Sequence, residues 1–191
     1  MNPIFQFNQY LLKRQVFALT GKFRVFDPSG RLLLFSEQKM FKLREDIRVY
    51  SDEAKTQEVL AIKARQIIDF SAAYDVIESA TGQKVGAMRR KGLASMFRDE
   101  WEVLDVNDNV LGKLFEDSMG LALVRRLLTN LVPQNYDMLF GETRVGDYKQ
   151  NFNPFTYELN LDFSMDTAGQ LDRRLGIAAG ILLAAVEGRQ Q

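Results

Sequence analysis

Short segments in which apolar and polar residues alternate recur along the first two thirds of the chain. They begin at Phe23, Ile47, Tyr74 and Trp101 and are nearly evenly spaced. The first reads Phe23-Arg24-Val25-Phe26-Asp27. An alternation with a period of two is typical of a strand that has one buried face and one exposed face. We therefore predict a half-buried strand at each of these positions.

A turn and a second apolar segment follow each predicted strand. The turns are Asp27-Pro28-Ser29-Gly30, Ser51-Asp52-Glu53, Ser79-Ala80-Thr81-Gly82 and Asn107-Asp108-Asn109. Such residues favour tight turns through side-chain hydrogen bonds, a fixed φ or tolerance of positive φ. The second strands are predicted at Arg31 to Phe35, Glu58 to Ile62, Lys84 to Met88 and Val110 to Phe115. Hairpins in series predict an antiparallel meander, which can close as a sandwich, a barrel or a propeller.

Beyond Phe115 the pattern changes to the period of a helix. Asp117 and Ser118 can cap this helix and Pro133 ends it. One face carries the apolar residues Gly120, Val124, Leu127, Leu128 and Leu131. We predict an amphipathic helix near residues 118–132. Such a helix can lie on a membrane or on a partner, although packing on its own sheet is the more common role.

Strand patterns return after this helix. They cover Tyr136 to Phe140, Thr143 to Tyr148 and Phe155 to Phe163, and one more precedes the repeats at Tyr10 to Phe17. With the four hairpins, the chain is predicted to contain about twelve strands.

The segment from Gly169 to Gly188 predicts a second helix of unusual composition. We expect Asp166 or Thr167 to cap it and the helix to run to about Glu187. Residues Gly176 to Val186 are apolar on every face, so either protein or lipid must surround them. A bilayer span needs about 20 residues, which is longer than this run. We therefore predict that protein surrounds the helix.

The strand count and this helix together predict the fold class. A barrel of eight strands is filled by its own side chains, so about twelve strands leave room for one helix roughly 10–12 Å across. We predict a mainly β (α+β) fold, a closed antiparallel barrel around the central apolar C-terminal helix, in a single domain of residues 1–191. Gly176 and Gly180 form a GxxxG pair, which in a membrane would mark a dimerisation face. Close packing in the core is the favoured interpretation.

Composition narrows the range of functions. The chain has no Cys and no His, and its 25 Lys and Arg balance its 25 Asp and Glu. Thiol nucleophiles, histidine acid–base catalysis and Cys/His zinc sites are excluded, and we expect no cofactor and no metal. The balanced charge leads us to expect no nucleic acid partner. Met1 to Leu12 lacks the pattern of a signal peptide and we expect no transmembrane segment, so the predicted compartment is the cytoplasm.

Several motifs occur in an order that points to a known family. They are Tyr10-Leu11-Leu12, Gly21 to Gly30, Tyr74-Asp75-Val76, Trp101-Glu102-Val103 and Leu171-Asp172-Arg173-Arg174-Leu175, the last of which opens the apolar helix. In this combination the chain resembles the tubby C-terminal-like superfamily, and within it the LURP-one-related and phospholipid scramblase families. The resemblance implies a twelve-stranded barrel threaded by a C-terminal helix. Tubby proteins bind phosphoinositides through basic residues, whereas Asn151 to Phe155 lacks the acidic residues of a scramblase calcium loop.

One basic cluster is the candidate site. It consists of Lys84, Arg89, Arg90, Lys91 and Arg98. Arg and Lys at the end of a strand can clamp a phosphate. Together with the resemblance, the cluster predicts a non-enzymatic domain that binds a phosphoinositide or another phosphorylated lipid headgroup, as a peripheral protein at the cytoplasmic membrane face. The competing interpretation of such a charge run is a solvated loop.

Two further functions stay open. A protein-interaction or scaffold domain without a small-molecule ligand would use the Met96-Phe97 pair and the helix near residues 118–132. An enzyme would depend on carboxylates such as Asp99, Glu100 and Glu102. Because alternation sends neighbouring strand residues to opposite faces, these carboxylates do not form a convincing pair and we expect no enzyme.

Overall fold

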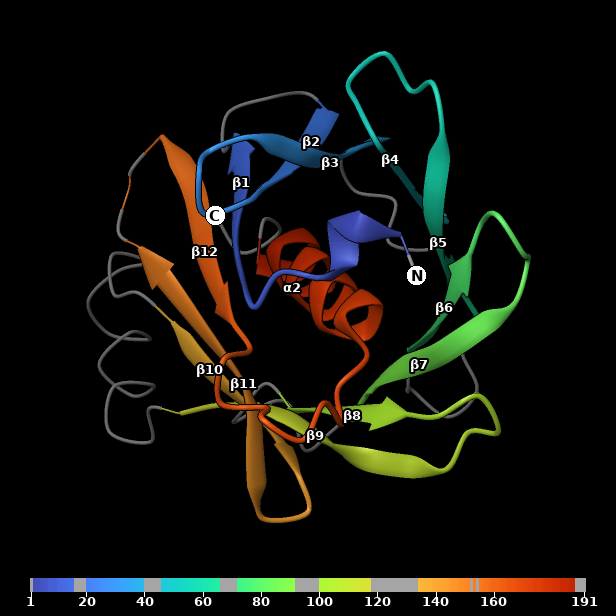
Figure 1. Cartoon of the computed structure of the whole chain (residues 1–191), viewed down its shortest axis with the longest axis vertical. Coiled ribbons are helices and arrows are strands. Elements are labelled where there is room, and N and C mark those ends of the chain that lie inside the picture. The colour runs from blue at the N-terminus through green and yellow to red at the C-terminus, as the bar shows by residue number, and fades with distance from the viewer. Residues whose placement is uncertain are drawn as a thin grey trace.

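Antiparallel strands close into one barrel in the computed structural model, which describes residues 2–15, 20–39, 46–65, 72–91, 100–117, 134–151, 153 and 155–187. Within these residues the strands are β1 (Gln9–Gln15), β2 (Thr20–Phe26), β3 (Leu32–Lys39), β4 (Ile47–Tyr50), β5 (Glu58–Ala64), β6 (Ala73–Glu78), β7 (Lys84–Arg90), β8 (Glu100–Leu104), β9 (Val110–Glu116), β10 (Asn135–Phe140), β11 (Thr143–Asn151) and β12 (Thr156–Asp162). Each strand pairs with its neighbours in sequence, and β1 also pairs with β12, which closes the ring (Figure 1). The predicted fold class is confirmed.

Hairpins β2–β3, β4–β5, β6–β7, β8–β9 and β10–β11 share one construction. In the first strand of each, two core residues flank an outward charged residue. Just after the second core residue the register shifts, because the opposite, second strand of the hairpin contains one extra residue, a β-bulge. The core residues that directly precede the register shifts are Val25, Val49, Val76, Val103 and Met138, all at most 1% exposed. A bulge bends a strand and increases its twist, so its repetition favours closure of the sheet. The first four hairpins are the predicted repeats, and β10–β11, whose strands the sequence also predicts, has the same construction.

Helix α2 (Arg173–Glu187) begins later than the sequence predicts. Asp172 is its N-cap, because the Asp172 Oδ1 accepts a hydrogen bond of 2.9 Å from the backbone N–H of Arg174. Gly169 has a φ of +63°, in the left-handed region, so it is not helical. Asp166, one of the predicted caps, instead accepts two backbone N–H groups of the loop between β12 and α2. The predicted start of this helix at Gly169 was therefore wrong.

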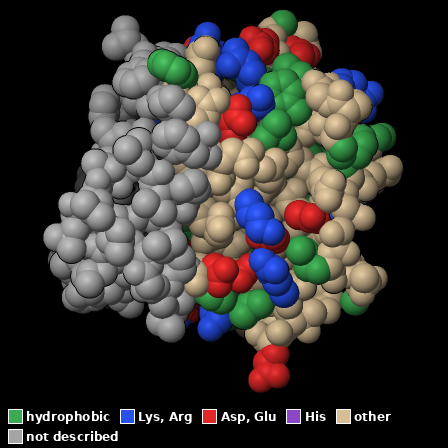
Figure 2. Space-filling view, turned by 90° about the vertical axis from the view of Figure 1, so that its left-hand side faces the viewer, with side chains coloured by type: hydrophobic (Ala, Val, Ile, Leu, Met, Phe, Trp, Pro, Cys, Tyr) green, Lys and Arg blue, Asp and Glu red, His purple; other side chains and the backbone are tan. Residues whose placement is uncertain are grey.

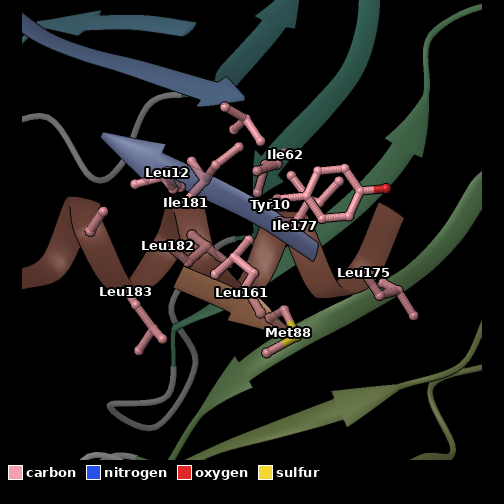
Figure 3. Close-up of a cluster of buried hydrophobic side chains, with 14 of the residues drawn as sticks. Tyr10, Leu12, Ile62, Met88, Leu161, Leu175, Ile177, Ile181, Leu182 and Leu183 are labelled. Atoms are coloured by element: carbon pink, nitrogen blue, oxygen red, sulfur yellow. The ribbon is translucent and has the colours of Figure 1, made fainter. Parts of the chain in front are cut away.

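Helix α2 fills the interior of the barrel (Figure 1). Its large apolar side chains are buried, and those at most 2% exposed include Ile177, Ile181, Leu182 and Leu183. Figure 3 shows them among side chains from several strands, namely Leu12 of β1, Ile62 of β5, Met88 of β7 and Leu161 of β12. Burying one such side chain contributes about 1.5–3 kcal/mol before the loss of conformational entropy. The helix is thus a core element, as predicted.

The glycines of the GxxxG pair allow close packing against the end of β12. A Cβ atom added at Gly176 would lie 2.7 Å from the Cζ of Phe163, and one at Gly180 would lie 3.0 Å from the Cδ2 of Leu161. The hydroxyl of Tyr148 also donates a hydrogen bond of 3.0 Å to the carbonyl of Gly176. Both glycines are therefore used inside the barrel.

The N-terminal segment covers the end of the barrel at which α2 begins. It contains the short helix η1 (Pro3–Phe5), and the Phe5 side chain is 1% exposed in the core. Arg173 joins this segment to the helix. Its guanidinium lies 2.8 Å from a carboxylate oxygen of Asp166 and donates a hydrogen bond of 3.0 Å to the side-chain oxygen of Asn8.

Some sequence predictions fall outside the described residues. They are the amphipathic helix near residues 118–132, the Met96-Phe97 pair, Arg98 and Asp99. In the described part of the chain, no helix combines the length and the apolar character needed to cross a membrane.

Candidate functional site

Two hollows lined by described residues lie at the surface, near the N-terminal segment. One has a volume of about 590 Å³ and lies between that segment and the start of β3, and the other has a volume of about 400 Å³ and lies against β1 and β12. Asp27, which borders the second hollow, accepts hydrogen bonds from the backbone N–H groups of Ser29 and Arg31 and from the Nε of Arg31. Its carboxylate therefore holds the β2–β3 turn rather than a ligand.

The predicted phosphate-binding residues on β7 and directly after it point in different directions. Arg89 and Lys91 project from the outer face of the barrel, and Arg90 between them points inward. Lys84 lies at the opposite end of the strand. Arg98 lies outside the described residues. The structure thus brings Arg89 and Lys91 together and separates them from Arg90 and Lys84.

Arg89 and Lys91 face two glutamates of β8. The Nη2 of Arg89 lies 2.5 Å from a carboxylate oxygen of Glu102, and the Nζ of Lys91 lies 2.8 Å from one of Glu100. The cationic side chains are 39% and 42% exposed. The hydrogen bond to Glu100 raises the pKa of Lys91, which therefore stays charged at neutral pH. The two glutamates that the enzyme hypothesis needed are ion-pair partners in this structure.

Arg90 lies against the core. Its guanidinium carbon is 6.0 Å from the centre of the Trp101 ring, a distance at which a cation and an aromatic face attract each other. Trp101 is itself 1% exposed. Arg90 therefore stacks on a buried ring and does not extend the Arg89 and Lys91 pair.

Lys84 belongs to a second group of charges, which links β5, β6 and the β8–β9 turn. Its Nζ lies 2.6 Å from Oδ1 of Asp108 and 3.4 Å from Oδ1 of Asp75. Arg65, which follows β5, donates to both of these carboxylates. Hydrogen bonds from Arg65 and then Lys84 lower the pKa of Asp108 to about 2. Sequence reasoning missed Arg65 and Asp108, because 43 residues separate them.

We call these two groups together the β5–β8 face. Its residues are Arg65, Asp75, Lys84, Arg89, Lys91, Glu100, Glu102 and Asp108, four cations and four carboxylates. Ion pairs between partly exposed side chains contribute only about 0.2–1 kcal/mol each. An anion with a higher charge can therefore replace a carboxylate on this face at a modest energetic cost.

The side of the barrel near β10 to β12 also carries charges of both signs. Figure 2 shows basic and acidic side chains lying next to each other in the described part of that side. One example is Asp147, whose carboxylate lies 3.0 Å from Arg144 and 2.7 Å from Lys149. This group provides a matched comparison for the β5–β8 face.

The described residues offer no ready metal site. Among them, no three His, Cys, Asp or Glu side chains gather closely enough to hold an ion. The chemistry available on the β5–β8 face is the reversible binding of charged groups by arginine and lysine.

The fold defines a class of protein, an antiparallel barrel plugged by its own C-terminal helix. The family model of the LURP-one-related proteins matches residues 8–183, nearly the whole chain, so the chain belongs to the LURP-one-related family. No curated protein and no solved structure matches it. The motif that opens α2 has a structural role here, because Arg174 binds the N-cap Asp172 and also Glu78, at 2.6 and 2.9 Å.

Proposed function

We propose that this protein is a non-enzymatic, peripheral membrane-binding domain of the cytoplasm that binds phosphorylated lipid headgroups on its β5–β8 face. The resemblance to the tubby C-terminal-like superfamily and its scramblase branch, which we propose as a wider relationship, supports this ligand class. The supporting geometric observation is the pair Arg89 and Lys91. These cations project side by side from the outer face of the barrel, and both are more than a third exposed.

The chemistry of this pair suits a phosphate. The guanidinium of Arg89 can donate two parallel hydrogen bonds to phosphate oxygens, and the ammonium of Lys91 adds a compact charge. Glu102 and Glu100 hold both groups in place until a ligand arrives. A phosphate monoester carries nearly two negative charges at neutral pH, so it competes well with a single carboxylate.

Co-sedimentation with vesicles tests the proposal. Wild-type protein should bind phosphatidylcholine vesicles that contain a phosphoinositide and should not bind phosphatidylcholine alone. The double variant Arg89→Ala, Lys91→Ala should weaken binding by at least about tenfold, because it removes two charge-assisted contacts. The variant Arg144→Ala, Lys149→Ala makes the same change of charge on β11 and should bind like wild type. Equal binding to both kinds of vesicle, or none, would reject the proposal.

One observation favours a protein partner as the second candidate. The β8–β9 hairpin exposes three apolar side chains, Val106 at 52%, Val110 at 55% and Leu111 at 38%. If this tip binds a protein, replacing Val106 and Val110 by Ser, which removes the apolar surface without adding charge, should abolish cross-links from the hairpin to that partner in cells and leave vesicle binding unchanged. Cross-links that persist in this variant would exclude the tip as the interface.

A further inference from the structure

The structure assigns a second anion site on the same face: we infer that Arg65 and Lys84 form a seat for a phosphate monoester group, and that the carboxylate of Asp108 occupies this seat in the free protein. The inference deepens the proposed function, on which it rests, by adding a site and a built-in competitor for its ligand.

Two cations converge on one oxygen atom. The Nη2 of Arg65 and the Nζ of Lys84 each lie 2.6 Å from Oδ1 of Asp108. Asp75 orients Arg65, because its carboxylate accepts hydrogen bonds from the Nε of Arg65 at 3.0 Å and from the Nη2 of Arg65 at 2.5 Å. The donors thus point at a position that an anionic oxygen already fills, and a second side chain holds them there. A phosphate oxygen can take that position with the same donors.

Lys84 reaches this seat because of the bulge in β7. Arg89 is five positions further along the strand, so strict alternation would put Lys84 on the inner face. The register shift after Val76 pairs Ile77 with Lys84 instead and returns Lys84 to the outer face. The bulge in hairpin β6–β7 therefore places Lys84 on the same face as Arg65 and Asp108.

The Asp108 carboxylate, which occupies the seat, comes from the β8–β9 turn, and the side-chain hydrogen bonds described within this turn are made by another residue. Asp105 holds the β8–β9 turn, because its carboxylate accepts hydrogen bonds from the backbone N–H groups of Asn107 and Asn109 and from the Asn109 side chain. Asp108 has a φ of +67°, a conformation that Asp and Asn tolerate better than most residues. A rotation of its side chain is enough to leave the seat while the turn stays in place.

The local charge favours replacement of the Asp108 carboxylate by a phosphate group. With Asp108 displaced, Arg65 and Lys84 face Asp75 alone, so the seat has an excess of one positive charge. The Asp108 side chain is 45% exposed, which gives a ligand access from solvent. Asp147, the carboxylate shared by Arg144 and Lys149, differs in this respect, because it lies within a strand and its side chain is 9% exposed.

Calorimetric titration of full-length protein with inorganic phosphate and with a soluble inositol phosphate tests the seat. Asp108→Asn removes the competing charge and keeps a residue that tolerates positive φ. Its affinity should exceed that of wild type by about tenfold, the effect of roughly 1.4 kcal/mol. Adding Lys84→Gln should cancel the gain. The control Asp147→Asn removes a carboxylate from a similar pair and should titrate like wild type. Asp108→Gly serves as the second variant if Asp108→Asn melts early.

The outcomes separate this inference from the proposed function. If Asp108→Asn and Asp108→Gly bind phosphate no better than wild type, while vesicle binding still depends on Arg89 and Lys91, the seat is wrong and the proposed function stands. If neither vesicles nor soluble phosphates bind to any variant, both fail. A gain for inositol phosphate without one for inorganic phosphate supports the seat and identifies the headgroup as its ligand.

Discussion

The carboxylate of Asp166 holds together the loop before α2 and the first residue of that helix, Arg173. The sequence suggested instead that Asp166 caps the C-terminal helix. Its side chain is buried and contacts Arg173 at 2.8 Å and two backbone N–H groups. Burial alone would raise the pKa of Asp166, but the hydrogen bonds from Arg173, Gln170 and Leu171 outweigh it and hold this pKa below its usual value. Asp166 therefore stabilises the fold in its ionised form.

The depressed pKa of Asp166 predicts a pH dependence. Because the folded pKa lies below the unfolded one, the stabilisation is fully present above about pH 4 and is lost as the pH falls through the folded value. Asp166→Asn should lower the free energy of unfolding by about 1–3 kcal/mol at neutral pH. Urea denaturation from pH 7 to pH 3 should show this difference from wild type shrinking below about pH 4. A difference that grows as the pH falls would contradict the assignment.

Gly112 marks a close approach between strands. A Cβ atom added here would clash with the backbone carbonyl oxygen of Leu139 on β10, which cannot move without shifting the strand. Gly112→Ala should lower the free energy of unfolding by about 1–3 kcal/mol in urea denaturation. Leu111→Ala, at an exposed neighbour, should change it by less than about 0.5 kcal/mol. Equal effects of the two substitutions would show that the strands are further apart than described.

At the scale of elements, alternation predicted the hairpins because each repeat places two core residues around one charged residue. The strands of the fifth hairpin were predicted, but not as a further repeat, because Tyr136-Asp137-Met138 lacks the valine of the other four. The bulges could not be predicted, since they depend on pairing across strands. The bulge in hairpin β6–β7 determines that the Lys84 side chain points outward. The candidate site was thus predicted by residue type, while its division into separate groups required the fold.

Helix α2 gives the most direct prediction at this scale. Leu182 is 1% exposed inside the barrel, so a charge at this position cannot be hydrated. Leu182→Asp should abolish soluble expression of folded protein. Leu182→Ala should fold and lose about 2–5 kcal/mol, measured by thermal or urea denaturation. A soluble Leu182→Asp protein with an unchanged melting curve would contradict the position of α2.

At the scale of the molecule, the sheet closes into a barrel and α2 fills its interior. The sequence predicted closure through the strand count and the length of the apolar helix. It could not predict that Arg65 and Asp108 meet, because their contact depends on how the β8–β9 turn lies over neighbouring strands. The overall balance of charge likewise conceals local groups in which cations pair with carboxylates from other strands and turns.

Above all, we propose that a phosphorylated headgroup binds to the outer β5–β8 face. Nuclear magnetic resonance of labelled protein, titrated with a soluble inositol phosphate, tests it residue by residue. If the headgroup binds there, we expect shifts for the side chains of Arg89 and Lys91 and for the amides of β7 and β8, with α2 unaffected. Shifts confined to the interior around α2 or to the β10–β12 side, or no shifts at all, would contradict it.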